Sequence, residues 1–549
     1  TLMTTGTLNT IVGAQAGDAL TEGANNTLLG YTAGGALTTG GSSTIIGAYA
    51  GDALTTGIRN TALGYGALST SVDGDKNTAI GYLALEDYEG ADGEGHNTAV
   101  GNESQLNAST GEYNTSLGSL SMGTGVTTGG YNVALGSEAG KALTSGSLNT
   151  LVGSKAGDAL TTGGSNTAVG YRALTTEDGH GRNTALGYEA LATLNAGADA
   201  YNVAIGYQAG TAVTTGIYNT IVGGLAGDAL TIGNQNTALG MLALSASVDG
   251  DSNTAVGFSA LRDYEDGDGN GNNTAVGSNS QVAATTGEFN TSVGSLSQGV
   301  GVLTGDGNTS VGYQAGQAIT SGSGNIAIGR GCGDAVTSGS DNISIGTSAL
   351  GTEDEHGKNV AIGSSALNAL NAGADGYNIA VGYEAGKLLT TGINNTIIGG
   401  GYAGDALTTG GNNVALGYNA LSTEDAHGRN VAIGSSALTT LNAGQDAYNI
   451  GIGYNAGYAM TLGVQNVIIG GLAGDSLTSG NYNTAIGYAA LSLEDAHGTN
   501  VAVGRAALNV QNAGADAFNV AVGYNAGVAV TTGIHNTLIG GTAGDSLTT

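Results

Sequence analysis

Polar and aliphatic residues follow one another in a short phrase that returns 31 times along the chain. Each copy opens with Asn, or once with Ser43, and has Ile, Leu or Val at its fourth position and Gly at its fifth. The first copy runs from Asn9 to Gly13 and the last from Asn536 to Gly540. Of the 30 intervals between copies, 21 are 17 residues long and the others are 18 to 20. A period this short and regular is typical of a solenoid, in which each repeat forms one coil.

The residue types in the phrase favour strands over helices. The copy from Asn202 to Gly206 reads Asn-Val-Ala-Ile-Gly, and the Thr, Val, Ile and Tyr residues that recur in the repeats have high strand propensity. Two or three Gly residues per coil would each cost a helix about 1 kcal/mol. We therefore predict an all-β fold, a parallel β-solenoid (a β-roll or β-helix) of 31 coils with 17 residues in most of them. We expect two short strands per coil, joined at Gly corners and paired with their copies in the next coil about 4.8 Å away.

The Asn and the Gly of the phrase are interpreted as structural anchors. Stacked Asn side chains can form a ladder of hydrogen bonds from coil to coil, and Asn tolerates turn geometry. The Gly at the fifth position indicates a corner with positive φ, or one too crowded for a side chain. We expect the fourth-position aliphatic residue to lie in the core, with a second large residue near the ninth or twelfth position. So thin a core favours further burial between chains, and we expect a homotrimer around the fibre axis.

The sequence also contains two kinds of coil and a duplication much longer than one coil. Some coils read Ala-Gly-x-Ala-Leu, whereas others read Ala-Leu, which moves the large residue three positions earlier. Residues 60–235 recur as residues 236–411, with a period of 176 residues. We interpret residues 1–549 as a single continuous repeat tract. Because the chain begins and ends within a coil, we expect it to be an excerpt of a longer fibre.

Composition and charge argue against several classes of protein. The net charge is −31 with only 12 basic residues, so the chain would repel nucleic acid and bare anionic membranes. Gly makes up 103 of the 549 residues while Pro is absent, which excludes collagen. The phased aliphatic residues argue against disorder. No apolar run approaches the roughly 20 residues of a transmembrane helix, and we expect no membrane insertion.

Two runs of the repeat carry a resemblance to known fibres. The run from Asn483 to Leu491 reads Asn-Thr-Ala-Ile-Gly-Tyr-Ala-Ala-Leu, and with the run from Thr161 to Gly170 it resembles the repeat tracts of bacteriophage tail fibres. Both runs also resemble the YadA-type head repeats of trimeric autotransporter adhesins, although the coil here is longer than the usual adhesin-head coil. The resemblance covers essentially the whole chain. It implies parallel coils from three chains in a trimeric β-roll or β-helix that attaches to cells or surfaces.

Acidic bulges in the longer intervals are the first candidates for a metal site. Asp and Asn alternate there across Gly, as in loops that wrap Ca²⁺ with oxygen ligands. Stacking would bring neighbouring bulges within about 5 Å, so that two of them could share an ion. Plain solvated turns are the alternative, because no clear bidentate Glu closes the loop. The candidate calcium ligands are Asp73, Asp75, Asp87, Asp92, Asp249, Asp251, Asp263, Asp266 and Asp268.

A second acidic motif combines Glu, Asp and His. It reads Glu-Asp-x-His and occurs at residues 177–180, 353–356, 424–427 and 494–497. The combination suggests a transition metal or an acid–base pair, but copies about four coils apart, roughly 19 Å, cannot share one ion. Repeated turn chemistry is the simpler interpretation.

Tyrosine and cysteine give weaker signals. Many of the 24 Tyr residues follow the Gly of the phrase, as Tyr207 does, or precede the Asn, as Tyr201 does. Exposed rows of Tyr could stack on sugar rings, but packing over the corners or between chains is the simpler interpretation. Cys332 takes the place of a small residue, so we expect a buried, unreactive thiol.

These features favour a structural function over catalysis. An enzyme needs a pocket of diverse residues, whereas near-identical coils offer length, stiffness and multivalency, so we expect no enzyme. We expect the shaft of an extracellular homotrimeric fibre, a phage tail fibre or an adhesin-like stalk, that mediates attachment to cells or surfaces. The body of a polymerising microbial surface filament is the alternative. The expected partners are copies of the chain itself, and a cell-surface glycan or other receptor bound through a region outside this chain.

Overall fold

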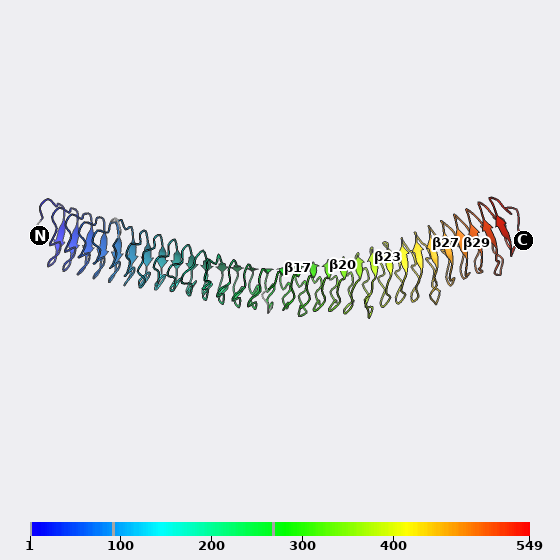
Figure 1. Cartoon of the computed structure of the whole chain (residues 1–549), viewed down its shortest axis with the longest axis horizontal. Coiled ribbons are helices and arrows are strands. Elements are labelled where there is room, and N and C mark those ends of the chain that lie inside the picture. The colour runs from blue at the N-terminus through cyan, green and yellow to red at the C-terminus, as the bar shows by residue number, and fades with distance from the viewer. Residues whose placement is uncertain (1–2, 90–93, 266–269) are drawn as a thin grey trace. The chain divides into compact units, whose positions relative to one another are not determined.

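The fold is a parallel β-solenoid with 31 coils, as the sequence predicts. The computed structural model describes residues 3–89, 94–265 and 270–549, and these residues contain no helix. It follows that the described residues include no helix long and apolar enough to cross a membrane. The chain divides into two compact units, Thr1–Asn273 and Thr274–Thr549. Within each unit the strands of successive coils lie side by side (Figure 1).

Each coil contributes one strand of three residues. The strands of the first unit are β1 (Thr10–Val12), β2 (Thr27–Leu29), β3 (Thr44–Ile46), β4 (Thr61–Leu63), β5 (Thr78–Ile80), β6 (Thr98–Val100), β7 (Thr115–Leu117), β8 (Val133–Leu135), β9 (Thr150–Val152), β10 (Thr167–Val169), β11 (Thr184–Leu186), β12 (Val203–Ile205), β13 (Thr220–Val222), β14 (Thr237–Leu239) and β15 (Thr254–Val256). The strands of the second unit are β16 (Thr274–Val276), β17 (Thr291–Val293), β18 (Thr309–Val311), β19 (Ile326–Ile328), β20 (Ile343–Ile345), β21 (Val360–Ile362), β22 (Ile379–Val381), β23 (Thr396–Ile398), β24 (Val414–Leu416), β25 (Val431–Ile433), β26 (Ile450–Ile452), β27 (Val467–Ile469), β28 (Thr484–Ile486), β29 (Val501–Val503), β30 (Val520–Val522) and β31 (Thr537–Ile539).

The expectation of two strands per coil is wrong, because the rest of the coil is built from turns. Residues with left-handed backbones interrupt the extended chain, such as Arg59 (φ 59°) before an anchor Asn and Thr32 (φ 54°) two residues after an anchor Gly. The turns still bond from coil to coil. The amide of Gly17 donates to the carbonyl of Ala33 at 3.0 Å. Hydrogen bonding between coils therefore extends beyond the single strand.

Strands pair in parallel and in register with the same positions of the next coil. Thr10 pairs with Thr27, and the middle residue of β12, Ala204, pairs with Ile221 of β13. Register is strongly specified here, since a slip of one residue would turn every strand side chain to the opposite face.

The core is filled from the third position of the phrase, not from the fourth. Among β2 to β30 the middle residue of each strand is buried, as Leu28 and Ile45 are, whereas the fourth-position residues Leu29 and Leu63 are 44% and 43% exposed. Successive residues of a strand point to opposite faces, so the third and fourth positions cannot both point inward. The expectation that the fourth position lies in the core is therefore wrong.

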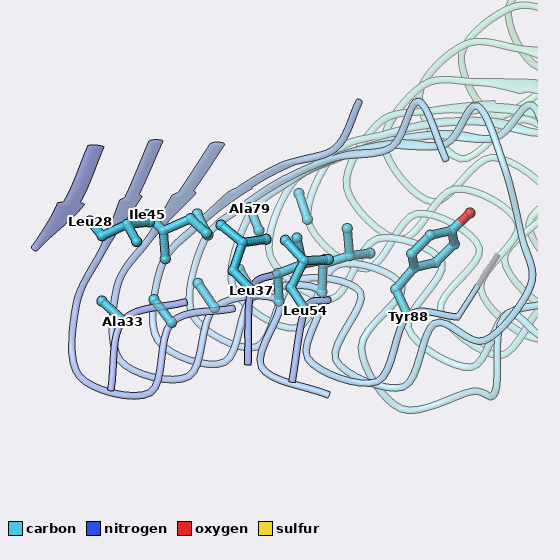
Figure 2. Close-up of a cluster of buried hydrophobic side chains, with 14 of the residues drawn as sticks. Leu28, Ala33, Leu37, Ile45, Leu54, Ala79 and Tyr88 are labelled. Carbon is cyan, nitrogen blue, oxygen red and sulfur yellow. The ribbon is translucent and has the colours of Figure 1, made fainter. Parts of the chain in front are cut away.

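The second large residue of the core occupies the twelfth or the ninth position, as expected. Leu37 and Leu54 are fully buried at the twelfth position, which we call the leucine slot, and Leu68 is fully buried at the ninth. Figure 2 shows Leu37 and Leu54 following one another along the coils, beside the row that Leu28 begins. The core of each unit is thus a narrow column, one or two large side chains per coil, with Ala between them.

Candidate functional site

The anchor Asn residues form a continuous hydrogen-bonded rail within each unit. Asn202 Oδ1 accepts a hydrogen bond from the amide of Asn219 at 2.8 Å, and Asn202 Nδ2 donates to the carbonyl of Gly216 at 2.8 Å. The same bond links the terminal anchors, since the amide of Asn26 donates to Asn9 Oδ1 and the amide of Asn536 donates to Asn519 Oδ1. The ladder therefore runs mainly from side chain to backbone, and direct amide-to-amide bonds occur in only some of the described coils.

The anchor Gly residues satisfy both of the conditions that the sequence suggested. Gly13 has a φ of +138° and Gly206 a φ of +142°. A Cβ at Gly206 would lie 2.4 Å from the carbonyl oxygen of Gly223 in the next coil, so a side chain has no room. Gly540 also has positive φ (+127°), but a Cβ there would meet only Ala543, at 3.9 Å. The positive φ of the corner favours Gly at all of these positions. Where another coil is stacked on the corner, the lack of space requires Gly as well.

The acidic bulges do not form a calcium cage among the described residues. Asp75 Oδ1 accepts a hydrogen bond from the amide of Ile58 at 2.7 Å, and Asp251 Oδ1 accepts one from the amide of Asn234 at 2.5 Å. Asp87 accepts from the hydroxyl of Thr70.

The remaining calcium candidates are scattered. Asp263 is paired with the neighbouring Arg262, Asp73 is exposed and Asp249 is half-buried. Asp92, Asp266 and Asp268 lie outside the described residues. None of the described bulge acids belongs to a group of three potential ligand side chains, and calcium binding stays a prediction.

Two of the coils that carry acidic bulges bury a tyrosine, which the sequence reasoning missed. Tyr88 and Tyr264 occupy the leucine slot and are fully buried (Tyr88 is labelled in Figure 2). The hydroxyl of Tyr88 donates to the carbonyl of Glu94, and the hydroxyl of Tyr264 donates to the carbonyl of Asn270 at 2.7 Å. Counting positions from the anchor Asn would have identified both as core residues.

The Glu-Asp-x-His motif also uses the leucine slot. Its Glu stands at the twelfth position in all four copies, and each of these side chains is fully buried: Glu177, Glu353, Glu424 and Glu494. The Glu Oε1 accepts a hydrogen bond from the backbone amide of the His three residues later, at 3.0 Å in the first copy and 3.2 to 3.3 Å in the others. This cap is the turn chemistry that the sequence suggested, but the burial of the Glu was not foreseen.

Burial has electrostatic consequences for these Glu residues. Desolvation raises the pKa of Glu177, Glu353 and Glu424 above the usual range, and it raises the pKa of Glu494 to about 7. The backbone donor of the His opposes this shift. The ring Nδ1 of the His lies 3.6 to 3.9 Å from the Glu Oε1, beyond hydrogen-bond distance. In three copies, Glu, Asp and His each present one potential ligand atom within 4.8 Å of the others.

Aromatic side chains stack from coil to coil on the surface of the chain. The rings of Tyr65 and Tyr82 are 5.6 Å apart, and those of Tyr113 and Tyr131 are 5.0 Å apart and nearly parallel. All four are between 41% and 61% exposed. Such rows contribute to coil stacking and leave their outer faces free to contact another molecule.

The outward face of the sheet carries aliphatic side chains, which is the feature that bears most on function. The second and fourth positions of the phrase point outward, and in the second unit β-branched residues fill both of them over consecutive strands. Ile343, Val360 and Ile379 stand in register at the second position of β20, β21 and β22. Ile345, Ile362 and Val381 stand beside them at the fourth. We call these two rows the aliphatic face.

Cys332 is fully buried, as expected, and its thiol donates to the carbonyl of Gly329 at 3.2 Å. Burial raises the pKa of this thiol to about 11, so very little reactive thiolate is present at neutral pH. We therefore expect Cys332 to resist a colourimetric thiol reagent in the native protein and to react fully in denaturant. Rapid labelling of the native protein would contradict this expectation.

No protein-family model matches the chain, and no curated protein matches it either.

Proposed function

We propose that this chain is the non-enzymatic shaft of an extracellular homotrimeric fibre that mediates attachment to cells or surfaces, as a phage tail fibre or an adhesin-like stalk. The observation that carries the proposal is the aliphatic face. The resemblance to tail-fibre and YadA-type repeats supports it.

The aliphatic face is unusual for a chain with this charge. The net charge is −31, yet none of the strands that the structure describes contains a charged residue. Ile379 is 40% exposed and the other five residues of the face are half-buried, although water is a poor environment for aliphatic side chains. A long exposed apolar surface rimmed by polar residues indicates an interaction site.

Copies of the same chain are the partner that fits this face best. The face presents two side chains per coil on three successive coils, and a partner with the same repeat can match this spacing coil by coil. An identical chain has that repeat in its own sequence, and most soluble oligomers are closed symmetric assemblies of identical chains. Three chains, each turning its aliphatic face to a common axis, would bury all three faces and leave the acidic corners in water.

In this proposal the mechanism is mechanical. Coil-to-coil hydrogen bonds and the association of chains make a stiff spacer. A glycan or other receptor on the target surface would be bound by a region outside this chain, which the shaft holds at a distance.

Charges placed on the aliphatic face should dissociate the oligomer. We expect the triple variant Ile345→Lys, Ile362→Lys and Val381→Lys to weaken association at least 100-fold, because burying each unpaired charge costs several kcal/mol. The isolated chain should still fold, since these side chains are not in its core. Sedimentation equilibrium should give the mass of three chains for the parent protein and of one chain for the variant.

A matched control adds the same charges to exposed turns. Ser321, Ser338 and Thr409 are exposed, and replacing all three with Lys should leave the mass at three chains. A parent protein with the mass of a single chain would refute the trimer. Equal dissociation of both variants would show that net charge, not the aliphatic face, governs association.

A further inference from the structure

Four coils place a carboxylate in a core position that otherwise suits leucine. The flanking coils show what this position ordinarily holds: Leu160 precedes Glu177 and Leu194 follows it in the leucine slot, both fully buried. An ionised carboxylate in such surroundings is costly unless a cation or several donors compensate it. Glu177 accepts hydrogen bonds from the backbone amides of His180 and Ala196, at 3.0 and 3.4 Å. Among the described residues the only basic side chain paired with it is that of His180.

Some of the potential ligand atoms of this motif have no hydrogen-bond partner among the described residues. The Nδ1 atoms of all four His residues (His180, His356, His427 and His497) are buried and find no hydrogen-bond partner among the described residues. The Oε2 atoms of Glu424 and Glu494 are buried and unpartnered in the same sense. A buried polar atom without a partner costs about 1 to 3 kcal/mol, so its recurrence at equivalent places calls for an explanation.

We propose that the motifs at residues 177–180, 424–427 and 494–497 each bind one divalent transition metal ion, of which Zn²⁺ is the representative. The Glu carboxylate and the His Nδ1 are the two inner ligands. The Asp carboxylate, at Asp178, Asp425 or Asp495, is the third. Solvent completes the coordination on the exposed side.

The distances fit an ion shared between Glu and His. Zn²⁺ lies about 2.0 to 2.2 Å from nitrogen and oxygen ligands, so two ligands at tetrahedral angles are about 3.4 Å apart. The Glu Oε1 and His Nδ1 atoms are 3.6, 3.7 and 3.8 Å apart in the three copies. That separation is too long for a hydrogen bond and requires only a small opening of the angle at the metal.

The ligand set also selects the class of ion. An imidazole nitrogen with carboxylate oxygens suits Zn²⁺ and its neighbours, whereas Ca²⁺ and Mg²⁺ prefer oxygen ligands alone. The ion would neutralise the buried carboxylate and tie the leucine slot to the corner where His replaces the usual Gly of the fifteenth position. It would therefore stabilise the turn formed by the four residues of the motif.

The fourth copy of the motif serves as an internal comparison. In residues 353–356 the Asp354 Oδ1 accepts a hydrogen bond from the amide of Glu355 at 2.7 Å. Its carboxylate is thus turned to the backbone, and the three-ligand grouping found in the other copies does not include this one. We expect this copy to bind the ion more weakly.

The test is Zn²⁺ binding by the full chain, measured by equilibrium dialysis with elemental analysis after removal of metals by a chelator. We expect three tight sites per chain, and an increase in Tm when Zn²⁺ is added. His427→Gln and Glu424→Gln should each reduce the tight sites to two. The glutamine in Glu424→Gln is a neutral isostere in a buried position, so this variant should fold.

The matched control is His535→Gln, because His535 is exposed and stacks on Phe518 outside the motif. This variant should keep all three sites. The proposal is overturned if the parent chain binds no stoichiometric Zn²⁺, which would leave the motif as a Glu–His pair alone. It is also overturned if His427→Gln and His535→Gln reduce binding equally.

Discussion

Replacing Gly363 with Ala should destabilise its coil by about 3 to 5 kcal/mol, the largest effect we expect from a single methyl group in this chain. Gly363 has a φ of +136°, a backbone conformation that costs other residues about 1 to 3 kcal/mol. In addition, the new Cβ would lie 2.2 Å from the carbonyl oxygen of Gly382 in the next coil. The two backbones would have to separate, and the parallel pairing of β21 with β22 would be lost with them.

Gly400→Ala is the control for this prediction. A Cβ at Gly400 meets nothing within 4 Å and its φ is not positive, so the substitution should be neutral or slightly stabilising. Native-state hydrogen exchange is the appropriate measurement, because the coils of a solenoid contact only their neighbours and can open locally. We expect faster exchange around β21 and β22 in Gly363→Ala only. Equal exchange in the two variants would contradict the steric argument.

Replacing Asn202 with Ala should cost about 2 to 5 kcal/mol, because it removes both bonds of one step of the rail. The amide of Asn219 would lose its acceptor and the carbonyl of Gly216 its donor, and Asn202 is fully buried. Water cannot easily replace either partner. Denaturant unfolding and the exchange rate of the Asn219 amide measure the loss.

The variant Asn202→Ser separates the loss of the acceptor from the loss of the donor. The chain already contains one Ser at an anchor position. Ser43 stands at an anchor position, and its Oγ accepts a hydrogen bond from the amide of Asn60 at 3.1 Å. A Ser at position 202 should therefore keep the acceptor and recover about half of the stability. If Asn202→Ser and Asn202→Ala were equally destabilised, the acceptor would not be the important half of the side chain.

The repeat made the architecture predictable. It did not reveal which strand side chains point into the core. Thirty-one copies average out the exceptions, so the parallel stacking, the Asn ladder and the Gly corner could all be read from the phrase. A strand of three residues is too short to display its own alternation, however. The large residue at the fourth position, such as Leu29, suggested an inward direction, whereas the narrow column has room for Ala at the third in most coils.

For the candidate sites too, the sequence identified the motifs but not the direction of their side chains. Glu177 and Tyr88 were judged by their neighbours in sequence, as parts of acidic turns. Their position within the coil is the twelfth, which the structure shows to be a core position. Residue type alone could not reveal this, because a Glu after two Thr residues reads as a solvated turn. The aliphatic face was overlooked for the related reason that its fourth-position residues had been assigned to the core.

The bulges also show where this chain can change length. Asn77 and Asn97 are separated by 20 residues, yet the amide of Asn97 still donates to Asn77 Oδ1 at 3.0 Å and Thr78 still pairs with Thr98. The extra residues of this coil therefore leave both the rail and the strand pairing unchanged. The corner behaves as a neutral site for insertion. Natural variation, or a designer adding a peptide epitope, can diversify the surface there one loop at a time while the stacked coils beneath stay the same.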